Sequence, residues 1–215
     1  EVDYIYKTFN GELTSAIEKS GYVLLGWMEL GSVYVFSKAP IAGPEDMKNA
    51  KMWVLEGDPI AQAAYKAIGV SPIPLSIVDV MSSLQTGLIN AVYGPPMGVI
   101  ALQWFTRTKY IYPVPMADSA GAVLLSKKFF DGLPADQQKI LVEISAKHLR
   151  RLNALSRDKN DNALESLKKR GITVTAKPSA EIAQLYQELG KKARTELVGK
   201  LYSEELLDRV EKSLE

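Results

Sequence analysis

An α/β fold in the first half of the chain, followed by a mainly helical second half, is the architecture that this sequence predicts. Between residues 51 and 93, strand patterns alternate with helix patterns at the spacing of βαβ units that build a largely parallel sheet. From Pro134 to Arg170 one long helical pattern follows and ends at Gly171. With 215 residues, of which 47% are hydrophobic, the chain can bury a substantial core as one large domain or two small ones.

Composition and charge exclude several functional classes. The sequence has no cysteine, which removes thiol nucleophiles, disulfides and cysteine-ligated metal sites. A formal net charge of +1 without a concentrated basic face argues against nucleic-acid binding. The longest apolar runs are far shorter than the roughly 18 to 20 residues that cross a bilayer. The start, Glu1-Val2-Asp3-Tyr4, has no signal-peptide pattern, so we expect a removed leader or a piece of a longer protein.

The first fifty residues predict a helix and two strands before a second helix. Residues 1–21 are expected to be an extended entry and a short helix ending at Gly21, where glycine can adopt the left-handed cap conformation. Residues 22–30 and 32–38 are rich in β-branched and aromatic side chains and are expected to form two strands, punctuated by Gly26 and Gly31. Pro44-Glu45-Asp46 then opens a helical turn, with acids near the positive end of its dipole.

The strongest helix start is Asp58-Pro59, because aspartate can accept the free backbone N–H groups and proline has none. This helix is expected to end at Gly69, and the next to run from Ser76 to Gly87, with strands at 51–56 and 88–93 beside them. Their buried stripes are expected to be Ile60, Ala63, Ala64, Ala67 and Ile68 in the first helix, and Ile77, Val80, Met81 and Leu84 in the second.

The rest of the chain is expected to be helical apart from one extended stretch. Residues 97–105 predict a helix, and residues 109–127 a crossing between lobes that Pro113 and Pro115 interrupt. Residues 172–175 predict a short strand, and the last two helices are expected to begin at Ser179 and Ser203. Gly190 would kink the first of these, and the long helix is expected to have an apolar seam of Leu141, Ile144, His148, Leu152 and Leu155.

Sequence motifs of enzymes are missing, since there is no nucleophile elbow, phosphate-binding loop, dinucleotide fingerprint or zinc-protease motif. The single histidine lies on the predicted apolar seam, and Asp136, Asp158 and Asp161 are scattered over helix surfaces as solvated charges. Catalytic residues, metal ligands and cofactors are therefore not expected. The aromatic residues are more informative, because several lie near the C-terminal ends of predicted strands, where open α/β sheets bind ligands, although core packing would explain each one singly.

Four motifs occur in order: Ser37-Lys38-x-Pro40-Ile41 before Pro44-Glu45-Asp46-Met47-Lys48, then residues 67–75 (AIGVSPIPL), residues 82–87 (SSLQTG) and residues 133–138 (LPADQQ). In them the chain resembles the DctP-like substrate-binding proteins of TRAP transporters, over about residues 26–171. The resemblance implies an α/β, type II periplasmic-binding-protein-like fold of two lobes with a long bracing helix, and a first lobe that is incomplete in this chain. It also implies a periplasmic receptor, its signal peptide removed, that closes on a small molecule between its lobes and delivers it to the membrane permease subunits.

The resemblance further implies three regions. Residues 1–27 and 113–133 would be the remnant of the first lobe and the crossover strands. Residues 28–112 would form the second, ligand-binding lobe, and residues 134–215 the long hinge-spanning helix and the C-terminal helices.

Three positions depart from the family pattern. Trp53 stands where the family has an arginine that binds a carboxylate through its planar fork of donors, Val33 stands at a second basic position, and Tyr93 lies in a segment where the family has a polar residue facing the ligand. A carboxylate buried there without a cation would have a large desolvation cost, so we expect an apolar, aromatic or uncharged ligand. The expected ligand-binding residues are Val33, Trp53, Ile77, Tyr93, Gly94, Trp104 and Met116.

Two other hypotheses remain at this point. The protein could be a non-enzymatic interaction subunit of a TRAP-like system, with the crevice filled by its own aromatic side chains and a helical-repeat periplasmic protein as its partner. A packed Trp53 would favour that hypothesis. An enzyme is the weakest, because the sequence has no paired groups at a suggestive spacing.

Overall fold

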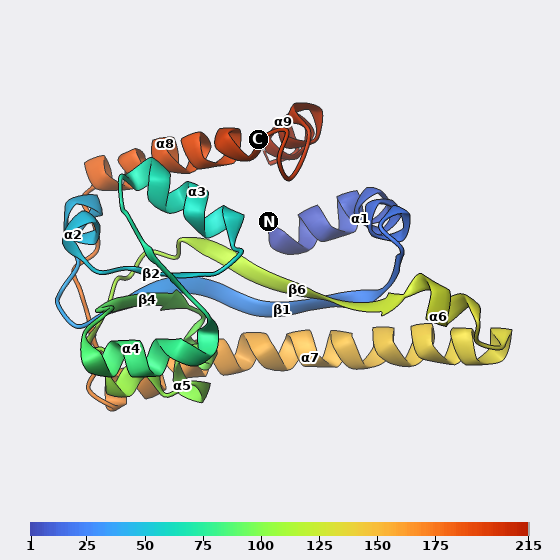
Figure 1. Ribbon diagram of the computed structural model, residues 1–215, viewed down its shortest axis with the longest axis horizontal. Helices are drawn as coiled ribbons and strands as arrows, with labels where there is room; N and C mark the ends of the chain where they lie inside the picture. Colours follow the sequence, from blue (N-terminus) through green and yellow to red (C-terminus); the bar gives the residue numbers. More distant parts are fainter. Residues whose placement is uncertain (215) are drawn as a thin grey trace. The chain divides into compact units, whose positions relative to one another are not determined.

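The computed structural model describes residues 1–214 and separates into two compact units, whose elements are labelled in Figure 1. Unit 1 combines residues 1–31 with residues 118–162, and unit 2 combines residues 32–117 with residues 163–215. Residues 134–215, which the resemblance groups together, are thus shared between the two units. None of the described helices combines the length and the apolar composition that a membrane crossing requires.

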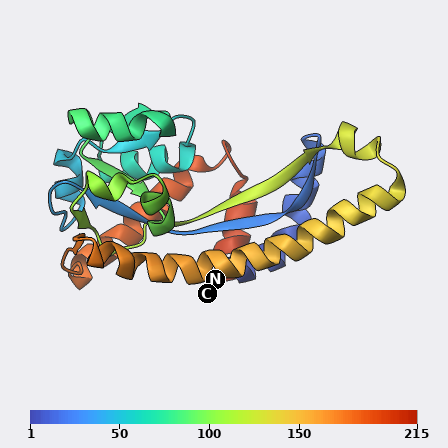
Figure 2. The ribbon, with the colours of Figure 1, turned by 90° about the horizontal axis from the view of Figure 1, so that it is seen from below.

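Unit 1 contains the first part of strand β1 (Tyr22–Ser37), which pairs with β6 (Ala117–Ser126), together with three helices (Figures 1 and 2). These are α1 (Val2–Lys19), α6 (Lys127–Asp131) and the part of α7 (Ala135–Lys169) before Ala163. The expected extended entry is wrong, because α1 begins at Val2. The long helix is confirmed to within one residue at each end.

One continuous strand replaces the two strands expected over residues 22–38, and the reason lies in its glycines. Gly26 and Gly31 have φ angles of 154° and 103°, values that glycine adopts readily and other residues avoid. A Cβ atom added at Gly26 would lie 2.6 Å from Leu149 Cδ1, and one at Gly31 would lie 2.6 Å from Asn160 Nδ2. The glycines therefore allow α7 to approach β1 closely, and they do not end the strand.

The expected apolar seam of α7 is also wrong, because Ile144, His148, Leu152 and Leu155 are exposed. The helix instead presents two amides to β1. Asn153 accepts a hydrogen bond from the backbone N–H of Glu29 (2.9 Å) and donates one to the carbonyl oxygen of Trp27 (3.2 Å). Asn160 donates to the carbonyl oxygen of Leu30 (2.9 Å), so polar groups satisfying the strand backbone decide which face points inward.

Unit 2 has a sheet in the order β4 (Ala91–Gly94), β1, β5 (Tyr110–Ile111) and β7 (Thr173–Val174). β1 is antiparallel to both β4 and β5, whereas β5 and β7 are parallel. β2 (Trp53–Leu55) and β3 (Ile73–Leu75) form a parallel pair joined through α3 (Pro59–Ile68), which is the expected βαβ unit. The prediction of a largely parallel sheet is therefore correct for the β2–β3 and β5–β7 pairs and wrong for β1, which is antiparallel to β4 and β5.

The helices of unit 2 follow their local capping signals. Asp58 Oδ1 accepts the N–H of Ala61 at 2.9 Å, and Ser179 and Ser203 cap the last two helices as predicted. The helices are α2 (Pro44–Asn49), α3, the 3₁₀ turn η1 (Ile77–Asp79), α4 (Val80–Thr86), α5 (Pro96–Ala101), the 3₁₀ turn η2 (Trp104–Thr106), α8 (Ala180–Leu197) and α9 (Glu204–Lys212).

Four helix predictions need correction. Ile60 is 58% exposed, and Tyr65 takes the inward position on α3. Ile77 is 43% exposed because it lies in η1, one turn before the helix that buries Val80 and Leu84. The helix expected over residues 97–105 is divided at Gln103, which has a φ of 57°. α8 runs through Gly190 as one helix.

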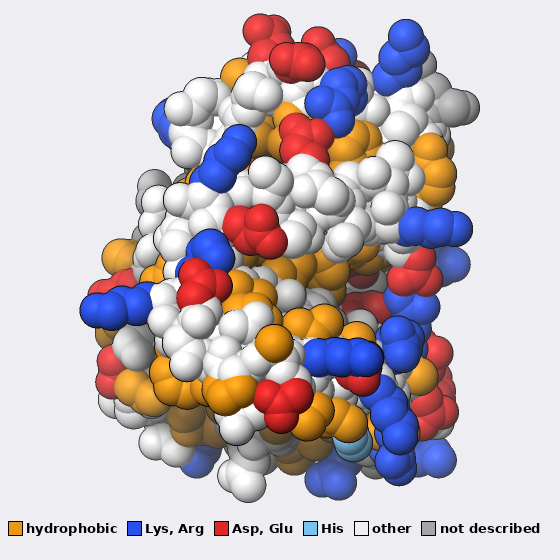
Figure 3. Space-filling view, turned by 90° about the vertical axis from the view of Figure 1, so that its right-hand side faces the viewer, with side chains coloured by type: hydrophobic (Ala, Val, Ile, Leu, Met, Phe, Trp, Pro, Cys, Tyr) orange, Lys and Arg blue, Asp and Glu red, His pale blue; other side chains and the backbone are white. Residues whose placement is uncertain are grey.

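Hydrophobic burial is concentrated in unit 2, which contains both large core clusters. Among the buried hydrophobic side chains of the described residues, Phe9 is the one that belongs to unit 1. Hydrophobic side chains also lie between the charged ones on the face shown in Figure 3. The large exposed hydrophobic side chains of unit 1 include Leu124, Phe129, Ile140 and Ile144.

Candidate functional site

Trp53, the residue that departs most from the family pattern, lies on β2 and is only 3% exposed. Its Nε1 donates a hydrogen bond to the carbonyl oxygen of Leu75 on the neighbouring strand β3, at 3.0 Å. Its ring stacks on Tyr93, with 5.0 Å between centroids, and meets the edge of Trp104 at 5.2 Å. These three residues, all predicted from the sequence, form what we call the aromatic cluster.

Tyr93 links the aromatic cluster to the start of α3. Its hydroxyl donates to Asp58 Oδ2 at 2.7 Å and accepts the backbone N–H of Leu55 at 3.2 Å. Burial raises the pKa of Tyr93, and its hydrogen bond to Asp58 raises that pKa further. Asp58 thus uses one carboxylate oxygen as a helix cap and the other to hold Tyr93. Sequence reasoning missed this second role, since the Asp-Pro pair was fully explained by the cap.

The other predicted site residues lie in three places. Gly94 is buried at the end of β4, where a Cβ atom would lie 3.7 Å from Trp104 Cζ3, so it adjoins the aromatic cluster. Val33 is 8% exposed on β1, and its carbonyl oxygen accepts the N–H of Met116 at 2.8 Å. Ile77 is exposed in the turn after β3. The structure therefore brings four of the seven positions together, namely Trp53, Tyr93, Gly94 and Trp104.

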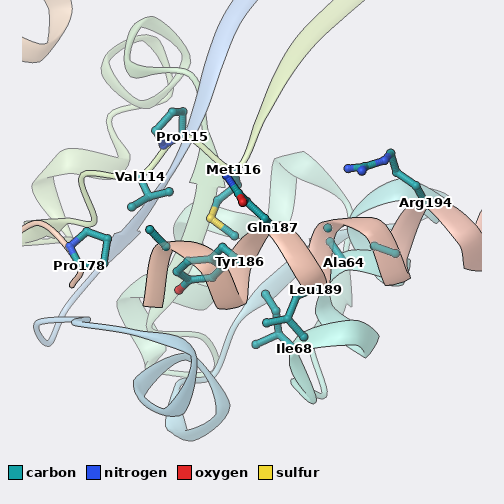
Figure 4. Close-up of a pocket in the computed structure, with 13 residues that line it drawn as sticks. Ala64, Ile68, Val114, Pro115, Met116, Pro178, Tyr186, Gln187, Leu189 and Arg194 are labelled. Atoms are coloured by element: carbon teal, nitrogen blue, oxygen red, sulfur yellow. The ribbon is translucent and has the colours of Figure 1, made fainter. Parts of the chain in front are cut away.

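A hollow of about 340 Å³ lies within unit 2, between α3, α8 and the segment 114–116 (Figure 4). Of the predicted ligand-binding residues, Met116 lines it. The other lining residues are mainly apolar, with Gln187 and Arg194 as the polar ones with long side chains. They are Ala64, Ile68, Val114, Pro115, Pro178, Ala183, Tyr186, Gln187, Leu189, Gly190, Ala193 and Arg194.

The electrostatics of the aromatic cluster differ from those of a carboxylate-binding site. The N–H of Trp53 is already bonded to Leu75, and the ionisable side chain that holds Tyr93 is the acid Asp58. A carboxylate entering here would meet an acidic group, and the ring that replaces the arginine has no charge to offer it. Residues 1–214 contain no group of three or more His, Cys, Asp or Glu side chains placed to hold a metal ion.

Comparisons with known proteins agree with the α/β fold and with the family that the sequence resembles. The family model for bacterial extracellular solute-binding proteins, family 7 (DctP), matches residues 4–197. The C4-dicarboxylate-binding periplasmic protein DctP of Rhodobacter capsulatus is 24% identical over 208 residues, which cover 95% of this chain and 62% of that protein. The 2,3-diketo-L-gulonate-binding periplasmic protein YiaO of Escherichia coli is 28% identical over 176 residues, which cover 80% of this chain and 53% of YiaO.

A solved structure shows the same fold. It is a TRAP periplasmic solute-binding protein from Desulfovibrio salexigens with bound orotic acid, and its TM-score to this chain is 0.86 at 22% identity. The match covers 98% of this chain and 68% of that protein.

The matched family model, which covers most of the chain, describes solute-binding proteins. The chain belongs to the bacterial extracellular solute-binding proteins of family 7. This membership confirms the resemblance, the α/β periplasmic-binding-protein fold and the extracytoplasmic class that the sequence predicts. The chain spans 62% and 53% of the two curated relatives, in agreement with a first lobe that is incomplete in this chain.

Proposed function

We propose that the protein to which this chain belongs is a periplasmic receptor of a TRAP-type transporter, which binds a small solute and delivers it to the membrane permease subunits. Family membership supports the receptor role. In this proposal residues 28–112 provide the ligand-binding lobe, because six of the seven predicted site residues lie within that range. Met116 adjoins it through its backbone bond to Val33.

We further propose that the solute is apolar, aromatic or uncharged, and the observation that carries this is the environment of Trp53. Its ring packs between Tyr93 and Trp104, and its N–H is satisfied by Leu75. Aromatic contacts give about 0.5–1.5 kcal/mol per pair beyond the apolar area that they bury. The relatives named above bind a C4-dicarboxylate, 2,3-diketo-L-gulonate and orotic acid, so this proposal assigns the present chain a ligand class different from theirs.

The test is calorimetric titration of the protein with indole, benzyl alcohol and succinate, together with native mass spectrometry after mild purification. We expect an apolar or aromatic molecule to be retained and succinate to give no saturable heat. Trp53→Phe keeps a ring in the aromatic cluster and should weaken the aromatic ligands without creating succinate binding. Tight succinate binding, with no preference for the aromatic compounds, would contradict the proposed ligand class and leave the receptor role intact.

One observation supports a second candidate, the interaction subunit with a crevice filled by its own side chains. Trp53 is almost completely buried by its neighbours, as that hypothesis requires. The comparisons give no support for a helical-repeat partner. If no solute class binds, while the protein is retained by immobilised permease subunits or by a helical-repeat periplasmic protein of the same system, the interaction role replaces the receptor role.

A further inference from the structure

The hollow between α3 and α8 has the properties of a second ligand site, apart from the aromatic cluster. It lies wholly within unit 2, and its volume of about 340 Å³ is within the usual range of roughly 300–1,000 Å³ for small-molecule sites. None of the three rings of the aromatic cluster lines it. Met116 is the predicted solute-binding residue that lines it, so the aromatic cluster does not account for this hollow.

Small side chains keep the hollow open. On α8 the lining includes Ala183, Gly190 and Ala193, and on α3 it includes Ala64. A helix normally contacts its neighbour through larger residues at such positions, and a cavity in a packed interior reduces stability. Small residues at this point leave space that a larger side chain would fill.

The shape of the hollow follows α8. Its lining residues Ala183, Tyr186, Gly190 and Arg194 are spaced three to four residues apart and so lie on one face of the helix. From position 183 to position 194 the helix advances roughly 16 Å, at about 1.5 Å per residue. Because most of the wall is apolar and the lining extends along α8, this space suits a hydrocarbon chain.

One end of the hollow has a positive charge. A Cβ atom at Gly190 would lie 3.4 Å from Arg194 Nη1, so the guanidinium extends over the glycine that lines the hollow. Arg194 Nε also donates to Glu211 Oε1 of α9 at 2.7 Å. A carboxylate of the chain itself thus occupies one edge of this guanidinium, whose planar fork of donors suits carboxylates.

We propose that the hollow binds a linear aliphatic monocarboxylate. Its hydrocarbon chain lies along α8 against Met116, Ala64 and Gly190, and its carboxylate binds Arg194 in competition with Glu211. The proposal joins three independent features, namely the apolar wall, the length along the helix and the cation at one end. It does not depend on the aromatic cluster, so the two sites can be tested separately.

The first experiment titrates the protein with octanoate, and with 1-octanol and acetate as probes of the chain and the head group alone. We expect saturable 1:1 binding of octanoate, and binding at least tenfold weaker for both other probes. Arg194→Gln should weaken octanoate about tenfold, which corresponds to about 1.4 kcal/mol. Lys192→Gln, an exposed charge change on the same helix, should leave it unchanged, and Glu211→Gln should strengthen it by removing the competitor.

The second experiment separates binding from folding. Gly190→Ala places a methyl group in the hollow and also improves the helix propensity of α8, so it should weaken octanoate binding without lowering the melting temperature. Trp53→Phe should leave octanoate binding unchanged, which distinguishes this site from the proposed solute site. Absence of saturable octanoate binding, equal effects of Arg194→Gln and Lys192→Gln, or undiminished binding by Gly190→Ala would each overturn the proposal.

Discussion

Asp58 has two structural roles that a single substitution can separate. Asp58→Ala removes the cap of α3, where Oδ1 accepts the N–H of Ala61, and also the acceptor of the Tyr93 hydroxyl. Asp58→Asn keeps a side-chain oxygen at the cap, because asparagine is about as good as aspartate there. It loses the charge that strengthens the bond from Tyr93.

The two contacts of Asp58 set the size of the expected change in the free energy of unfolding. Loss of an N-cap costs about 1 kcal/mol, and a hydrogen bond to a charged group contributes about 1.5–3 kcal/mol. Because Asp58 and Tyr93 are only partly buried, water can replace some of the lost bonding, and the lower end applies. We expect Asp58→Ala to reduce the free energy of unfolding by about 2.5 kcal/mol, and Asp58→Asn by about 1 kcal/mol.

The assay is urea denaturation of both variants, of Tyr93→Phe and of the double variant Asp58→Ala with Tyr93→Phe. If the two side chains share one hydrogen bond, the double-mutant cycle should give a coupling energy of about 1–2 kcal/mol. A coupling energy near zero, or equal losses for Asp58→Ala and Asp58→Asn, would show that the bond at 2.7 Å does not hold Tyr93 in solution.

Three further predictions test other parts of the structure. Because the pKa of Tyr93 is raised in the folded protein, its neutral form contributes stability that is present below its ordinary pKa of about 10 and is lost as the pH rises above 10. The melting temperature should therefore fall above pH 10, and it should fall less steeply in Tyr93→Phe. In urea denaturation, Gly31→Ala should lower the free energy of unfolding by about 1–3 kcal/mol, because Gly31 has a positive φ. Gly11→Ala, at a helical position with open space around it, should raise the free energy of unfolding by up to about 1 kcal/mol. The opposite order of the two variants would contradict this prediction. Hydrogen bonds from Lys200 and from Lys66 together lower the pKa of Glu196 to about 2, so Lys200→Met should move the NMR titration of Glu196 part of the way toward 4.5, and an unmoved titration would exclude the bond from Lys200.

Local signals predicted most helices, since they depend on the few residues at each end. The Asp58-Pro59 start, the Gly69 end and the long helix from Ala135 follow directly from capping and periodicity. The interior faces of elements were less predictable. A glycine in a strand pattern is compatible with a turn or with a helix passing close by, and only the position of α7 decides between them for Gly26 and Gly31.

The α7 seam illustrates a second limit. Periodicity assigns the inward face to apolar residues, whereas in unit 1 that face includes Asn153 and Asn160, which bond the backbone of β1. For the candidate site, the sequence predicted Trp53, Tyr93 and Trp104 among the ligand-binding residues; their rings lie in contact, and their role in binding stays a prediction. The resemblance could not reveal Asp58, whose capping role already accounted for its presence in the sequence.

The two candidate sites differ in the sign of the charge that they offer, and this decides how their ligands must differ. In our proposal the aromatic cluster disfavours a carboxylate, because Asp58 holds Tyr93 and the resemblance implies that Trp53 replaces an arginine. The hollow ends at Arg194, which already binds the carboxylate of Glu211. Because most of the wall of the hollow is apolar, an acid bound at Arg194 needs an apolar body to contact that wall, and succinate lacks one.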